Sequence, residues 1–184
     1  MTQMDDRASR NAVTIDHLAL ACRHLEEMIA AGVTENGAIR TLELFADVYA
    51  KCYKGGSATP HHVDQVDLWS VKARRIRSRM PDAKPRDYFR VEHGTPRRGF
   101  ARKVLELYRK DKLSAKTMAK LVERYWKLAV ITLEEDERLN KVARSKTFNT
   151  PEERWAAAGI WFQKVNSKPK SNRRSFDSAT LRSG

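Results

Sequence analysis

A carboxylate and an imidazole are adjacent near the middle of the chain, at Glu92 and His93, just before a Gly-Thr-Pro turn. Carboxylates and imidazoles are the side chains that most often take part in general acid–base catalysis, so this pair is a candidate catalytic site. His61 and Asp64 are spaced to share a cation on one helix face. The alternatives are structural: His93 would hold the turn after a strand, and Asp64 would favour a helix N-terminus.

The segment 92–96, EHGTP, resembles the opening of an HNH-type nuclease motif, where an acid and a histidine leave a strand before a loop with proline. The resemblance implies that Glu92 would help to hold a metal and that His93 would activate water. The family also needs a downstream histidine or asparagine ligand. No histidine follows His93, and Asn140 and Asn149 lack the strand-to-helix context of that ligand.

Other catalytic signatures are missing from the sequence. It contains no glycine-rich phosphate loop, no Cys-x-x-Cys pair and no serine nucleophile motif. We therefore expect no cofactor and no metal, and we favour a binding protein over an enzyme. A nuclease centred on Glu92 and His93 is the alternative.

The positive charge of the chain is concentrated in residues 72–127, which hold nineteen Lys or Arg and six Asp or Glu. This surplus equals the formal net charge of the whole chain, +13. A concentrated field of one sign attracts polyanions, and nucleic acid is the commonest of these. The sequence therefore predicts contacts to phosphates from Lys72, Arg74, Arg75, Arg77, Arg79, Arg97, Arg98, Arg102, Lys103, Lys116, Lys120, Arg124 and Lys127, and from the tail residues Lys168, Lys170, Arg173 and Arg174.

The chain divides into four segments by composition. We expect a flexible leader over 1–13, a helical hairpin over 14–56, a basic α+β region over 57–165, and a disordered basic tail over 166–184. The hairpin could serve packing, a protein contact or a homodimer seam. No long apolar run or signal peptide is visible, so we expect a cytoplasmic protein with no membrane partner.

Apolar spacing predicts a mostly helical, α+β fold. Helices are expected from residue 15, after a Thr34 cap, from Thr59-Pro60 through Val66 and Trp69, over 96–110 and over 114–127. Short strands are expected at 88–91, 128–131 and 160–165, with short helices after Thr132 and Thr150.

These patterns favour a protein that binds DNA or RNA through the phosphate backbone of the nucleic acid. We expect it to have an accessory or regulatory role in a bacterium or mobile element. A second alternative is an interaction module or inhibitor whose basic face binds an acidic protein.

Overall fold

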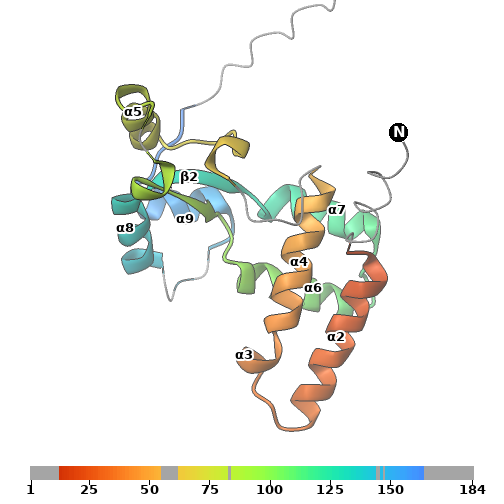
Figure 1. The fold of residues 1–184 in the computed structure, drawn as a ribbon. Coiled ribbons are helices and arrows are strands. Elements are labelled where there is room, and N and C mark those ends of the chain that lie inside the picture. The colour runs from red at the N-terminus through yellow and green to blue at the C-terminus, as the bar shows by residue number, and fades with distance from the viewer. Residues whose placement is uncertain (1–12, 55–61, 83, 144–145, 147, 164–184) are drawn as a thin grey trace, which may run out of the picture.

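The structure is a computed structural model that describes residues 13–54, 62–82, 84–143, 146 and 148–163. Within these residues the chain forms eight α-helices and one two-stranded antiparallel sheet, which confirms the mostly helical α+β class. The elements gather into a helical lobe and a sheet lobe, seen on the right and left of Figure 1. None of the helices in the described part of the chain is long and apolar enough to cross a membrane.

The helical lobe contains α2 (Ile15–Ala30), α3 (Glu35–Ala38), α4 (Arg40–Tyr53), α6 (Arg97–Arg109) and α7 (Ala115–Tyr125). Its core is built from apolar side chains of α2, α4, α6 and α7, among them Leu18, Leu42, Phe100 and Met118. The described part of the hairpin, residues 14–54, thus shares one core with the two helices that follow β1.

Local caps account for where most of these helices begin. Thr14 accepts a hydrogen bond from the backbone N–H of His17, and Ser114 does the same for Thr117. The expected single helix after Thr34 was wrong in one respect: it is divided at Ile39 into α3 and α4. Ile39 is fully buried, and α3 is a single turn capped by Thr34.

The sheet lobe is built on β1 (Phe89–His93) and β2 (Leu128–Thr132), which pair antiparallel with Val91 opposite Val130. Three helices surround this ribbon: α5 (Val71–Arg79), α8 (Leu133–Ala143) and α9 (Pro151–Ala157). Two 3₁₀ turns, η1 (Val63–Gln65) and η2 (Pro85–Asp87), complete the lobe. Both strands lie where the sequence predicts them.

The helix expected from Thr59-Pro60 is wrong at its start. The chain forms η1, runs extended, and enters α5 only at Val71, with Ser70 as the cap; Thr59 and Pro60 lie outside the described residues. The reason is a tertiary pairing: Ser70 N–H donates to Val130 O at 2.9 Å, and Val130 N–H donates to Leu68 O at 2.8 Å. These bonds hold 68–70 against β2, so Trp69 lies in an extended segment.

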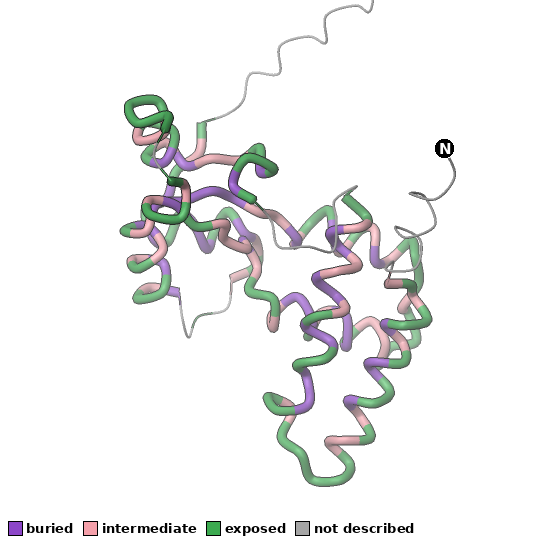
Figure 2. The backbone as a smooth tube through the Cα atoms, in the orientation of Figure 1, coloured by how far each residue is buried: buried purple, intermediate pink, exposed green. Residues whose placement is uncertain are grey.

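The third strand expected at 160–165 is also wrong for the residues that are described. Phe162 makes one isolated antiparallel bridge, to Ser70, and no strand forms over 160–163. Figure 2 shows that burial is concentrated where the elements face one another, whereas α5 is largely exposed, with Ala73 its one buried residue.

Candidate functional site

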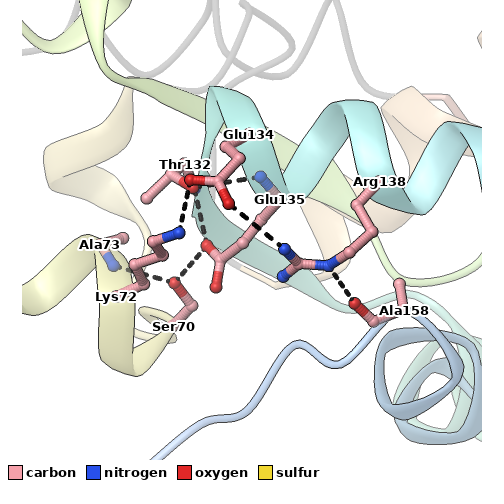
Figure 3. Close-up of polar contacts among 8 residues, drawn as sticks. All are labelled: Ser70, Lys72, Ala73, Thr132, Glu134, Glu135, Arg138 and Ala158. Carbon is pink, nitrogen blue, oxygen red and sulfur yellow. Dashed lines mark hydrogen bonds and ion pairs between the residues drawn. The ribbon is translucent and has the colours of Figure 1, made fainter.

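The basic helix α5 is anchored by a buried polar network at its N-terminus (Figure 3). Ser70 is fully buried, and its Oγ accepts a hydrogen bond from Ala73 N–H at 3.0 Å, which caps the helix. The same hydroxyl donates to Oε2 of Glu135 at 2.7 Å. Because Glu135 belongs to α8, this contact fixes the start of α5 against another helix of the lobe.

Glu135 also begins its own helix. Its Oε2 accepts from Thr132 N–H at 2.8 Å, while Thr132 Oγ1 accepts from Glu135 N–H at 3.1 Å, the reciprocal pattern of a capping box. The sequence predicted this capping box. It did not predict that the same carboxylate would hold Ser70, 65 residues earlier in the chain.

The exposed face of α5 carries three arginines with no carboxylate oxygen within 4.0 Å among the described residues: Arg74, Arg75 and Arg79. Helical periodicity places Arg75 and Arg79 on the side opposite the buried Ala73, and Arg74 roughly 100° around the helix from Ala73. The other two cations of the helix are paired. Lys72 Nζ lies 2.5 Å from Glu134, and Arg77 lies 3.5 Å from Asp64. A groove of about 660 Å³ runs beside the helix, and Arg74 is part of its wall.

The arginines of α6 have a different environment. Arg98 lies 2.6 Å from Glu43, Arg102 lies 2.9 Å from Glu35, and Arg109 lies 2.7 Å from Glu26. All three acids belong to α2, α3 and α4. The acidic hairpin therefore neutralises much of α6 within the molecule, and these arginines bind the hairpin in the free protein.

Pairing of this kind extends over the whole basic segment. Nine of its nineteen cations have a carboxylate within 4.0 Å: Lys72, Arg77, Arg86, Arg97, Arg98, Arg102, Arg109, Lys110 and Lys127. The remaining ten have none in the part of the chain that the structure describes. The electrostatic field that a partner meets is therefore weaker than the net charge of residues 72–127 suggests.

The cations of α7 divide in the same way. Lys116 and Lys120 are exposed and have no described carboxylate beside them. Arg124 and Lys103 lie over the ring of Tyr125, at 5.1 and 4.0 Å from its centroid. Lys127 pairs with Glu152 of α9. The tail cations Lys168, Lys170, Arg173 and Arg174 lie outside the described residues.

Glu92 is held in an ion pair. Its carboxylate lies 2.6 Å from Arg154, a residue of α9 that is only 7% exposed, and the same guanidinium nitrogen donates to His93 O at 3.1 Å. Burial raises the pKa of Glu92, and the positive charge of Arg154 offsets part of that rise. The side chain thus joins the end of β1 to α9.

His93 points to the other lobe. Its Nε2 lies 3.2 Å from Oδ1 of Asp47, which also accepts from Trp126 Nε1 at 3.2 Å. Oδ2 of Asp47 lies 2.8 Å from Lys51 Nζ. Burial alone would raise the pKa of Asp47, but the hydrogen bonds from His93 and Lys51 outweigh it and hold that pKa well below its ordinary range.

Asp47, Lys51 and Arg154 could not be predicted as buried polar residues from their types, because charged residues are usually exposed. A signal was present in α4: Glu43, Asp47 and Lys51 recur every four residues and so share one helix face. All three are buried in the structure.

A cavity of about 820 Å³ lies between the lobes. The turn at 94–96, the first half of α6 and Arg154 form part of its wall. Nε of Arg154 is buried and has no hydrogen-bond partner among the described atoms. Six of its sixteen lining residues are Lys or Arg and could attract an anion, but Glu43 and Glu106 also line it.

Neither of the two pairs considered as metal ligands, Glu92 with His93 and His61 with Asp64, joins a larger group of ligands among the described residues. Across the described residues no group of three or more His, Cys, Asp and Glu is arranged to hold a metal ion. Asp64 is 3.1 Å from His62 and contacts Arg77, and His61 lies outside the described residues.

No protein-family model matches this chain, and the comparisons with curated proteins and with solved structures also give no match.

Proposed function

We propose that the protein binds nucleic acid by its phosphate backbone, with α5 as the central contact. The observation that carries the proposal is the exposed face of Arg74, Arg75 and Arg79, whose guanidiniums have no carboxylate partner among the described residues. A guanidinium without an internal partner gains most from a phosphate, because binding breaks no existing ion pair.

The buried contacts that hold the start of α5 strengthen this proposal. The network of Ser70, Glu135 and Thr132 is buried, so the helix axis is fixed relative to the sheet before any partner binds. Fixed cations lose less conformational freedom on binding than cations on a loop. Arg75 and Arg79 lie one turn apart, about 6 Å along the axis, which is close to the separation of neighbouring phosphates.

The paired arginines of α6 have a secondary role in this proposal. Arg98 and Arg102 would have to leave Glu43 and Glu35 before they could bind phosphate. We therefore rank α5 first, the lysines Lys116 and Lys120 of α7 second, and the α6 arginines last. The assignment to an accessory or regulatory role stays a prediction from the sequence.

The test compares two triple variants that remove the same charge. Arg74, Arg75 and Arg79 are changed to Ala in one, and Lys112, Lys116 and Lys120 in the other. Affinity for a labelled oligonucleotide is measured by fluorescence anisotropy at several salt concentrations. We expect the α5 variant to lose at least about ten-fold in affinity and to flatten the salt slope by about three, one for each lost phosphate contact.

The matched lysine variant should lose less at every salt concentration. Alanine is a good helix former, so circular dichroism should show both variants folded. Equal losses in the two variants would show that net charge, not α5, determines binding. A wild-type protein that binds acidic proteins but no oligonucleotide would support the interaction-module alternative.

A further inference from the structure

Trp161 lies beside the first turn of α5. Val71 N–H, at the start of that helix, donates to Trp161 O at 2.9 Å, and the adjacent residues Ser70 and Phe162 form a β-bridge. Figure 1 shows the last described residues, in blue, running next to α5. Two segments about 90 residues apart in sequence are thus joined at the base of the arginine face.

The side chain of Trp161 faces solvent. In an extended segment successive side chains point in opposite directions. Phe162 packs on Trp155 with ring centroids 4.8 Å apart, so it points to the core, and Trp161 points away from it. Trp161 is 64% exposed, whereas Trp155 and Trp126 are 1% and 7% exposed.

The backbone of Trp161 is bonded to the start of the helix that carries these arginines. Val71 precedes Arg74 and Arg75 by three and four residues, so these side chains follow one another up one face of the helix. The backbone bond to Val71 therefore places Trp161 one helical turn before Arg74 and Arg75. Neither arginine has a carboxylate partner among the described residues. An isolated exposed apolar residue needs no functional explanation, but an exposed indole whose backbone is bonded to the helix of two such arginines has the chemistry of a base-binding site.

We propose that Trp161, Arg74 and Arg75 form a binding site for single-stranded nucleic acid. The indole stacks on one unpaired base, and the two guanidiniums hold the phosphates that flank it. A base within a duplex is already stacked on both faces, so the indole can contribute only where a base is unpaired. This inference rests on the proposed function and adds its substrate class.

The experiment measures the affinity of the full chain for two probes, an oligothymidylate of about 20 nucleotides and a duplex of the same length, at one salt concentration. The variants are Trp161→Ala and Trp161→Phe. We expect Trp161→Ala to weaken single-strand binding about ten-fold or more, since stacking by one aromatic ring is worth that much. Duplex affinity should change less than about three-fold, and Trp161→Phe should recover part of the single-strand affinity.

Tryptophan fluorescence gives a second readout. Trp161 is the most exposed of the described tryptophans, so the single strand should quench a component of the emission that the duplex does not. That quenching should disappear in Trp161→Phe. Phe keeps an aromatic ring at this position, so Trp161→Phe should fold even if Trp161→Ala is unstable. In that case the loss of quenching in Trp161→Phe tests the stacking site.

The outcomes separate this inference from the proposed function. If the α5 triple variant loses affinity but Trp161→Ala binds the single strand as tightly as wild type, backbone binding stands and the stacking site is wrong. Equal losses on single strand and duplex in Trp161→Ala would also overturn the stacking site. If the wild type binds neither probe, both proposals fail.

Discussion

Nε2 of His93 lies 3.2 Å from Oδ1 of Asp47, and this contact joins the end of β1 in the sheet lobe to α4 in the helical lobe. Asp47 is 2% exposed and accepts further hydrogen bonds from Trp126 and Lys51. The histidine that the sequence offered as a general base is therefore part of the junction between the lobes.

Replacing Asp47 by Asn should lower the free energy of unfolding by about 3–5 kcal/mol, because Lys51 would keep a buried charge without its partner. Urea denaturation measures the change. The matched control is Asp47→Asn combined with Lys51→Met, which removes the buried cation as well. The double variant should be more stable than Asp47→Asn alone, and the ion-pair account is wrong if it is less stable.

The stability of the wild type should depend on pH through Asp47. Its pKa is depressed in the folded protein, so ionised Asp47 contributes stability that is fully present above the unfolded pKa of about 4 and is lost as pH falls below it. The difference in unfolding free energy between wild type and Asp47→Asn should therefore shrink as pH falls from 5 towards 2. A difference that grows on acidification would contradict this assignment.

His93→Ala should cost about 1–2 kcal/mol of stability, as expected for the loss of a partly buried hydrogen bond. Oligonucleotide binding should persist, and the wild type should not degrade nucleic acid with Mg²⁺ or Mn²⁺, since Glu92 is held by Arg154. Gel analysis of plasmid and RNA tests for cleavage. Metal-dependent cleavage by the wild type, abolished in His93→Ala with binding intact, would establish the nuclease alternative.

Gly94→Ala should be strongly destabilising, by about 1–3 kcal/mol or more. A Cβ atom at this position would overlap the Cβ of Pro151 and approach the Trp155 ring to 2.8 Å, where the turn after β1 packs on α9. Gly99→Ala is the control, because the nearest atom to its added Cβ lies at 3.5 Å and the position is in α6. Thermal unfolding should show a lower Tm for Gly94→Ala and an unchanged or higher Tm for Gly99→Ala.

Features that depend on neighbours along the chain could be predicted from the sequence. The caps at Thr14 and Ser114 and the capping box of Thr132 with Glu135 are made between residues three apart. The strands at 88–91 and 128–131 were predicted from short runs of β-branched and aromatic residues, and they pair with one another. Such signals survive because tertiary packing agrees with the local preference.

The start of α5 depends on contacts between segments that are far apart in the sequence. Helical spacing continued through Val66 and Trp69, but backbone bonds from Leu68 and Ser70 to Val130 held that segment extended. A local pattern cannot reveal a partner that lies about 60 residues away in sequence.

The ion pairs of the basic segment also depend on tertiary contacts. The sequence predicts Arg98 and Arg102 as part of an exposed basic surface. In the folded protein, Glu43 and Glu35 form ion pairs with them. Folding also buried Asp47 and Arg154 where the lobes meet. Coulombic attraction depends on distance in space, and neither the net charge of a segment nor its spacing fixes which opposite charge is brought within 4 Å.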